Sequence, residues 1–167
     1  MTKIRPIVKE DANRLAEYAN NRKIWLNLRD YFPHPYSIDD AYGFIEMING
    51  PSPNKIFAIA NEEGFIGIVG IHPLTDIYAR IADLGYWLGE PHWGKGHASR
   101  AVQLMIDYTW QETQVLRIEA GVFDHNPASM RVLEKCGFYK EAVRKNRLIK
   151  DGKLYDEHMY VLLRPES

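Results

Sequence analysis

The sequence has one cysteine, no long apolar run and almost no net charge, and each absence excludes a class of protein. Cys136 is the only cysteine among 167 residues, so an intramolecular disulfide and a cysteine metal cage are excluded. The six histidines show neither an HxxxH nor an HExxH spacing, so no metal is expected. No apolar run approaches the ~20 residues that cross a bilayer, and the charged first residues do not resemble a secretory signal. We therefore expect a cytoplasmic protein without a membrane partner.

The charge balance argues against nucleic acid as a partner. The 21 basic and 22 acidic residues give a net charge of -1, with no basic tail and no block of one sign. A broad electrostatic footprint for DNA or RNA is therefore not expected. The length suits a single domain, residues 1–167, and the 46% of apolar residues are enough for one core.

Hydrophobic periodicity and turn residues predict the chain order β-α-α-β-β-β-α-β-α-β-β. Strands are expected at residues 3–8, 56–60, 65–71, 81–88, 116–123, 138–148 and 153–163. Helices are expected at about residues 10–20, 37–48 and 126–136, and residues 94 to about 111 are expected to form a glycine-rich turn that runs into a long helix. Since helices are interspersed among the strands, the pattern favours an α+β fold around one mixed sheet.

A glycine-rich turn between a strand and a helix is the most informative segment. Residues 86–99 read YWLGEPHWGKGHAS, with Gly94 and Gly96 directly before the expected helix. Glycine permits a tight turn with exposed N–H groups, and the helix start adds unpaired donors and a positive dipole end. The turn therefore suits a phosphate or pyrophosphate, although a short Gly-x-Gly is more often a plain turn. Neither the dinucleotide fingerprint nor the P-loop motif is complete.

A second distinctive segment follows the next strand. Asn126 and Pro127 form a good N-cap and first helical position. Ser129 and Cys136 share one face of the expected helix, which Gly137 ends. Two interpretations remain open: a capped helix with an inward-facing serine, or an Asn126 amide and a Ser129 hydroxyl that face a ligand along the neighbouring strand.

Together these segments resemble the GNAT superfamily of acyl-CoA-dependent N-acyltransferases. In that family a Gln/Arg-x-x-Gly-x-Gly/Ala turn holds the CoA pyrophosphate, and here residues 93–98 read WGKGHA, with tryptophan in the usual first place. The segments GYWL (85–88), NPAS (126–129) and EKCGF (134–138) are similar to the RimJ/RimL branch, whose members acetylate protein N-termini or small amines. Matching residues between positions 5 and 45 extend the resemblance to nearly the whole chain.

The resemblance implies a twisted, mostly antiparallel mixed sheet flanked by helices, with splayed central parallel strands that hold the acyl-CoA. It implies acetyl-CoA as co-substrate and direct attack by a primary amine in a ternary complex, without a covalent enzyme intermediate. Dimers occur in this family, although no sequence feature requires a homodimer. The expected cofactor-binding residues are Tyr86, Trp87, Leu88, Trp93, Gly94, Lys95, Gly96, His97, Ala98, Ser99 and Asn126.

The implied chemistry needs a base for the ammonium, a polarised thioester carbonyl and a proton donor for the thiolate. Asp83 matches a strand glutamate that is the base in some members, and Glu119 is the alternative. The family's donor tyrosine is replaced by Leu133, so Ser129, which matches a serine proposed for this role in the branch, is the donor candidate. Further donor candidates are Tyr139, Tyr155 and Tyr160.

The acceptor pocket is expected between the N-terminal helices and the last hairpin. Its candidate walls are five residues of a proline-interrupted loop, Trp25, Tyr31, Phe32, His34 and Tyr36, which could also be partly buried anchors. Two other functions remain open for the chain. One is a non-catalytic acyl-CoA-binding or sensing module, and the other is a nucleotide-phosphate binder that uses the glycine turn.

Overall fold

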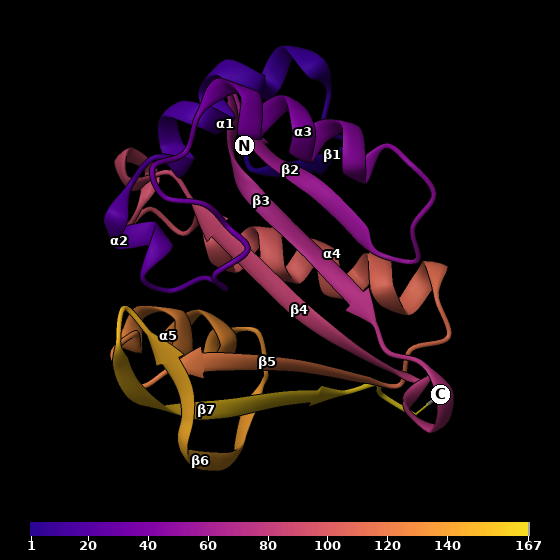
Figure 1. Ribbon diagram of the computed structural model, residues 1–167. Coiled ribbons are helices and arrows are strands. Elements are labelled where there is room, and N and C mark those ends of the chain that lie inside the picture. The colour runs from indigo at the N-terminus through magenta and orange to yellow at the C-terminus, as the bar shows by residue number, and fades with distance from the viewer. Residues whose placement is uncertain (167) are drawn as a thin grey trace.

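The structure, a computed structural model, describes residues 1–166 (Figure 1). Its strands are β1 (Lys3–Arg5), β2 (Lys55–Asn61), β3 (Gly64–Pro73), β4 (Ile81–Leu88), β5 (Arg117–Phe123), β6 (Tyr139–Lys150) and β7 (Lys153–Leu163). Its α-helices are α1 (Ala12–Ala19), α2 (Arg22–Trp25), α3 (Ile38–Ile48), α4 (His97–Glu112) and α5 (Pro127–Lys135). In the described part of the chain, no helix is long and apolar enough to span a membrane.

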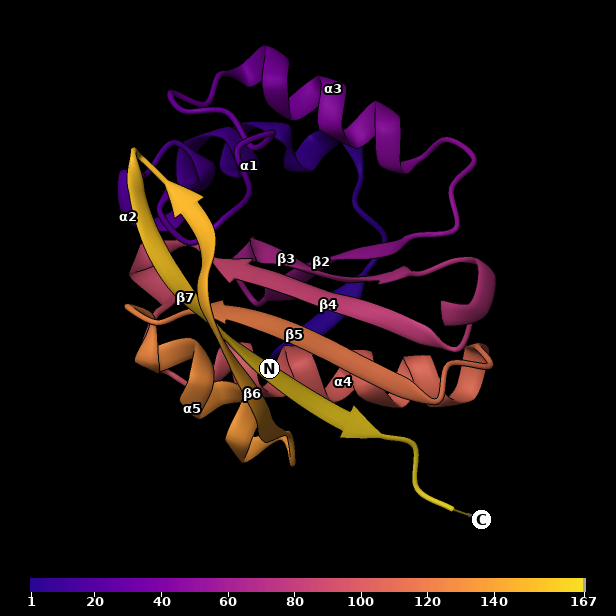
Figure 2. The same cartoon turned by 60° about the horizontal axis from the view of Figure 1, so that its bottom comes forward.

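One sheet in the order β1-β2-β3-β4-β5-β7-β6 organises the molecule. Neighbouring strands are antiparallel except for β4 and β5, which are parallel. These two strands pair over only three residues each, Ile81–Asp83 and Arg117–Glu119, and then separate (Figures 1 and 2). The mixed sheet and its splayed central pair confirm the expected α+β architecture.

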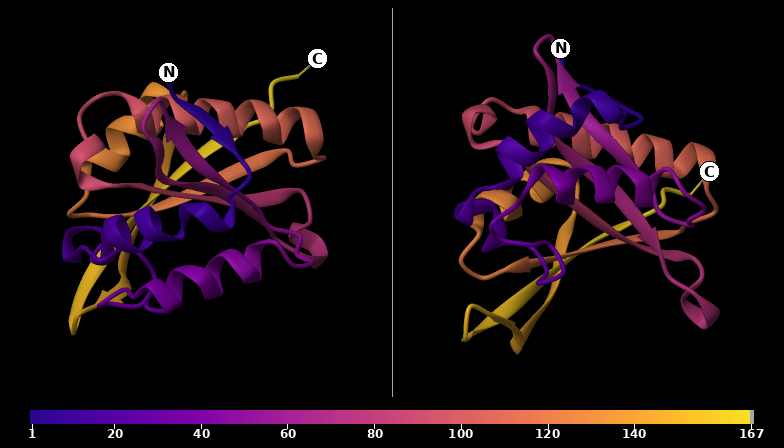
Figure 3. Two further views of the ribbon diagram at one scale, coloured as in Figure 1. Left: turned by 90° about the horizontal axis from the view of Figure 1, so that it is seen from above. Right: turned by 45° about the horizontal axis from the view of Figure 1, so that its top comes forward.

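Helices cover both faces of this sheet (Figure 3). On one face α1 and α3 enclose a core that includes Leu15, Ile45 and Phe65. On the other face α4 and α5 pack over a larger core that includes Met105 and Ile118. The helices therefore fix the sheet from both sides, while the gap between β4 and β5 is left without a strand to fill it.

The expected helices and strands occur in the expected order, with one additional helix. Several of their expected first or last residues are wrong, and each difference has a cause nearby in the sequence. The first strand ends at Arg5 because Pro6 has no N–H for the ladder. A 3₁₀ turn at residues 9–11 delays the first helix to Ala12. The glycine turn expected to run into a long helix does so, and the helix begins at His97 after two glycines of positive φ. Helix α2 was not expected, and β6 extends two residues further, to Lys150.

Candidate active site

The glycine turn between β4 and α4 is open to solvent on its outer side. Gly94 and Gly96 have φ of +74° and +84°, and a Cβ placed on either would meet no atom within 4 Å. The indole Nε1 of Trp93 donates to the Leu88 carbonyl at 2.9 Å, which holds the tryptophan against the strand end. The first three N–H groups of α4 have no acceptor within the helix. The turn is therefore an anion cradle that its own side chains do not close.

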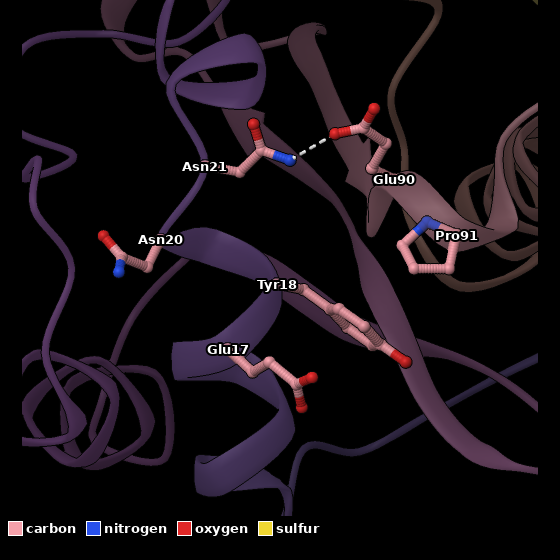
Figure 4. Close-up of a pocket in the computed structure, with 6 residues that line it drawn as sticks. All are labelled: Glu17, Tyr18, Asn20, Asn21, Glu90 and Pro91. Atoms are coloured by element: carbon pink, nitrogen blue, oxygen red, sulfur yellow. Dashed lines mark hydrogen bonds between the residues drawn. The ribbon is translucent and has the colours of Figure 1, made fainter.

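Contacts with α1 and α2 hold the segment that leads into this cradle (Figure 4). Asn21 and Lys23 donate to the Glu90 carboxylate at 2.9 Å and 2.7 Å. Tyr18 forms a 3.1 Å hydrogen bond with the Nε2 of buried His92. Sequence reasoning did not find these supports, because each joins residues more than 60 positions apart.

The remaining expected turn residues have ordinary surroundings. Lys95 is exposed. His97 forms a 2.8 Å hydrogen bond with the Thr2 hydroxyl, and the Ser99 carbonyl accepts a contact from the Cys136 thiol at 3.4 Å. Ala98 packs against the larger core. The His97 and Ala98 side chains are therefore part of the scaffold, and the main-chain N–H groups are the donors that this segment leaves open.

The splay leaves one side of β4 without a strand partner. Tyr86 and Trp87 pair with β3 through Val69 and Ile68, but β5 pairs with β4 no further than Asp83. Because alternate N–H groups of a strand point to opposite sides, some of those beyond Asp83 face the gap. These free main-chain donors are the groups that can polarise a carbonyl held in the gap.

A cleft of about 1230 Å³ lies beside the splay. Its walls come mainly from β3, β4, β5, α3, α5, the loop of residues 27–33 and the β6–β7 hairpin. It brings together nine of the expected site residues: Tyr31, Phe32, Tyr36, Asp83, Tyr86, Trp87, Glu119, Asn126 and Ser129. Trp25, His34, Leu88 and the turn residues 93–99 do not line it.

A row of ionisable side chains crosses the cleft floor. Asp83 lies opposite His72 on β3 and opposite Glu119 on β5. Burial raises the pKa of Asp83, while the Arg29 guanidinium opposes this shift and the Glu119 carboxylate adds to it. Burial and Arg29 together lower the pKa of His72. A half-buried carboxylate with a raised pKa has the character of a general base.

The alternative carboxylate is already paired. Arg117 donates to the Glu119 carboxylate at 3.1 Å and 3.2 Å, and it also binds Glu141. The two carboxylates raise the pKa of Arg117, led by Glu141. By contrast, the Asp83 side chain has no hydrogen bond or ion pair within residues 1–166. The geometry therefore favours Asp83 over Glu119 as the carboxylate that faces a ligand.

Ser129 lies at the opposite wall and is bonded to Tyr86. The Tyr86 and Ser129 hydroxyls are 2.6 Å apart, and the Tyr86 hydroxyl also donates to the Ser129 carbonyl at 3.2 Å. Burial raises the pKa of Tyr86. Asn126 caps α5 by accepting from the Ser129 N–H at 3.3 Å, as expected. The other donor candidates, Tyr139, Tyr155 and Tyr160, do not line the cleft.

The aromatic loop divides into cleft walls and anchors. Phe32 packs against Tyr36 and Trp87, with ring centroids 5.0 Å and 6.0 Å apart, and all three line the cleft. Tyr31 lines the cleft with 75% of its surface exposed. Trp25 and His34 instead stack on each other at 5.5 Å outside the cleft. The structure therefore favours the anchor interpretation for half-buried Trp25, whereas His34 is exposed and neither lines the cleft nor is buried.

Sequence reasoning missed a buried lysine that attaches the last hairpin to this loop. The Lys150 side chain is 1% exposed, its Nζ donates to Asp30 at 2.9 Å, and it lies 3.9 Å from the centre of the Trp25 ring. Arg22 and Asp151 form a second contact at 2.5 Å. No local signal marks Lys150, because a lysine near a hairpin turn ordinarily points to solvent.

The class of protein is an acyl-CoA-dependent acetyltransferase. Its features here are two parallel strands that separate, a turn with main-chain N–H donors open to an anion, and a cleft with carboxylates at its base. The acetyltransferase (GNAT) domain model matches residues 2–139, and the chain belongs to the GNAT family. Within residues 1–166, no group of three or more His, Cys, Asp or Glu side chains is arranged to hold a metal ion.

Relatives and a solved structure agree with this assignment. The chain is 33% identical to the uncharacterized N-acetyltransferase p20 of Bacillus licheniformis over 98% of this chain and 93% of that protein. It is 29% identical to the ribosomal protein uS5-alanine N-acetyltransferase of Escherichia coli over 98% and 88%, which supports the RimJ/RimL-like branch. Its fold is similar to spermidine N-acetyltransferase from Vibrio cholerae, in complex with CoA and spermine, with a TM-score of 0.82, 22% identity and coverage of 97% and 95%.

Proposed function

We propose that this protein transfers the acetyl group of acetyl-CoA to a primary amine by direct attack in a ternary complex. The observation that carries the proposal is the placement of one unpaired carboxylate, Asp83, where β4 and β5 separate. The pyrophosphate lies on the N–H groups of residues 94–99, and the pantetheine arm runs along the free side of β4. We place this activity in the cytoplasm, because the single cysteine requires no oxidising compartment.

Asp83 is the proposed base. Its carboxylate takes a proton from the acceptor ammonium, and the freed amine nitrogen attacks the thioester carbonyl carbon. Main-chain N–H groups of β4 beyond Asp83 stabilise the resulting oxyanion. Collapse of this intermediate breaks the carbon–sulfur bond and releases the CoA thiolate, and the new amide nitrogen loses its remaining extra proton to solvent water.

Ser129 is the proposed proton donor to that thiolate. Its hydroxyl contacts Tyr86, whose phenol is kept protonated by burial; the phenol passes its proton to Ser129 and is reprotonated from solvent water. The side chain of Leu133, at the place of the family's donor tyrosine, has no proton to give. The absence of the family's donor tyrosine is the reason why a sensing module is the second candidate function. The Tyr86–Ser129 pair supports a catalytic acetyltransferase instead, because it provides another proton donor.

The acceptor is proposed to bind between the loop of residues 27–33 and the β6–β7 hairpin. Both a peptide N-terminus, as in the ribosomal-protein relative, and a small amine, as in the spermidine enzyme, suit an open cleft of this size. The aromatic wall of Phe32, Tyr36 and Trp87 provides an apolar surface for the acceptor's carbon chain.

The test is the release of CoA thiol from acetyl-CoA over a panel of peptides, polyamines and amino sugars, with Asp83→Asn as the key variant. We expect a ~10²–10⁴-fold loss of kcat with acetyl-CoA affinity retained. Since the base works only when ionised, activity should fall as the pH drops through the raised pKa of Asp83, and the variant should lose this limb.

Glu119→Gln is the matched control, because it neutralises the neighbouring carboxylate. If the Asp83→Asn variant kept the wild-type turnover, the base would be Glu119 or water instead of Asp83. Tight acetyl-CoA binding without thiol release across the whole panel would instead support the sensing module.

A further inference from the structure

Most acidic side chains of the cleft already accept a hydrogen bond from another group of the protein. The Asp30 carboxylate binds Lys150 at 2.9 Å, and Glu157 binds Arg144 at 3.5 Å. Glu119 is held by Arg117, as described above. The Asp40 carboxylate accepts from the Ser37 N–H at 2.8 Å as part of a helix cap. Four of the five acidic residues that line the cleft are therefore occupied by the protein itself.

Three charged side chains remain unpaired in the cleft. Within residues 1–166, the side chains of Asp83, Arg29 and Arg147 form no hydrogen bond and no ion pair. The Arg29 guanidinium lies near enough to the floor to act on the pKa of both Asp83 and His72. Because burial and Arg29 keep the pKa of His72 low, that ring is neutral at pH 7 and adds no further charge. The unpaired groups therefore comprise one anion and two cations.

The two arginines approach the cleft from different elements. Arg29 belongs to the loop of residues 27–33, and Arg147 belongs to β6, within the irregular stretch between Arg144 and Leu148 where pairing with β7 shifts. The contact between Lys150 and Asp30 joins the hairpin to the loop, so the two segments that carry the arginines are held together. A guanidinium presents a rigid fork of donors that matches a carboxylate or phosphate.

We propose that the acceptor is a small primary amine that also carries an anionic group, a carboxylate or a phosphate, which Arg29 and Arg147 bind while its amine faces Asp83. This inference rests on the proposed function and specifies its substrate class. A polyamine fits the same cleft poorly where Arg29 and Arg147 lie, because its additional ammonium groups would meet two guanidinium groups that have no carboxylate partner within residues 1–166.

The test compares amines of equal length that differ only in the far end. An n-alkylamine, an ω-aminocarboxylate, an aminoalkyl phosphate and spermidine are assayed by CoA thiol release, and kcat/KM is measured for each. One charge-assisted contact corresponds to ~10–100-fold, so we expect the anionic amines to exceed the alkylamine by that factor, mainly through KM. The kcat/KM values of the ω-aminocarboxylate and the aminoalkyl phosphate, compared with each other, show which anion is bound.

Arg29→Gln and Arg147→Gln should each reduce the ratio of kcat/KM between the anionic amines and the alkylamine. Lys153→Gln is the control, because it removes one positive charge from the same hairpin at a residue that does not line the cleft, and it should keep the ratio. Equal use of the alkylamine, a preference for spermidine, or turnover confined to peptides would overturn the substrate class and leave the acetyltransferase proposal intact.

Calorimetry separates the two proposals if no amine is acetylated. Binding of the ω-aminocarboxylate or aminoalkyl phosphate, weakened by either arginine variant, would support the anion subsite although the proposed chemistry had failed. Absence of such binding in the presence of CoA would overturn the subsite as well.

Discussion

Replacing Gly96 with aspartate tests whether the turn before α4 binds a diphosphate. Gly96 has φ of +84°, is exposed, and has open space where a side chain would project. Asn and Asp are the non-glycine residues that best tolerate this backbone conformation. Gly96→Asn and Gly96→Asp therefore share shape and backbone strain and differ by one negative charge, so their comparison isolates the electrostatic contribution.

The size of the charge effect follows from Coulomb's law. A carboxylate ~6 Å from a diphosphate with about two negative charges is repelled by ~1.4 kcal/mol in water and by ~5.5 kcal/mol at an effective dielectric constant of 20. Because the turn is exposed, the lower part of this range applies. We expect CoA to bind Gly96→Asp about 10- to 100-fold more weakly than Gly96→Asn.

Isothermal titration calorimetry of CoA into the wild-type protein and both variants measures this difference. The gap between the two variants should narrow as salt is raised from ~0.05 M to ~0.5 M, because the screening length shortens. Equal melting temperatures would verify that both variants fold alike. If the two variants bound CoA with the same Kd at low salt, the diphosphate would not lie on this turn.

Two further substitutions test the donor and the strand packing. Ser129→Ala leaves the Tyr86 hydroxyl its bond to the main-chain carbonyl and should lower single-turnover thiol release by ~10²-fold with acetyl-CoA affinity unchanged; unaltered release would exclude Ser129 as donor. Gly67→Ala places a Cβ 2.2 Å from the Trp87 carbonyl and should lower the free energy of unfolding by ~1–3 kcal/mol in urea titrations. Gly85→Ala, with no atom within 4 Å, is the control, and equal losses would contradict this packing.

Features set by local backbone chemistry could be predicted from the sequence. The strand at residues 81–88 has the expected bounds. Asn126 caps its helix as expected, and Ser37 caps α3 in the same way, since each places a side-chain oxygen near free N–H groups. The last hairpin turns at Asp151 and Gly152, which both adopt positive φ, the pattern that a tight hairpin requires. In each case the cause lies within about three residues of the effect.

Features that depend on contacts between distant segments could not be predicted. Lys150 and Asp30 are 120 positions apart, and nothing near either residue indicates that the lysine is buried. The residues of the aromatic loop looked alike in the sequence, yet packing separates the Trp25–His34 stack from the cleft wall. The pKa of Asp83 likewise depends on Arg29, which lies in a loop before α3.

The two halves of the active site therefore differ in how they are encoded. The proposed cofactor half consists of main-chain N–H groups of one continuous turn and one strand, so a short motif suffices to describe it. The acceptor half consists of side chains brought together by the sheet, the loop of residues 27–33 and the last hairpin. Because substitutions in that half change its charge without disturbing the cradle, related chains can share the chemistry and differ in acceptor. We therefore expect the unpaired Asp83, Arg29 and Arg147 of the cleft, rather than the acceptor of any one relative, to determine which amine this chain acetylates.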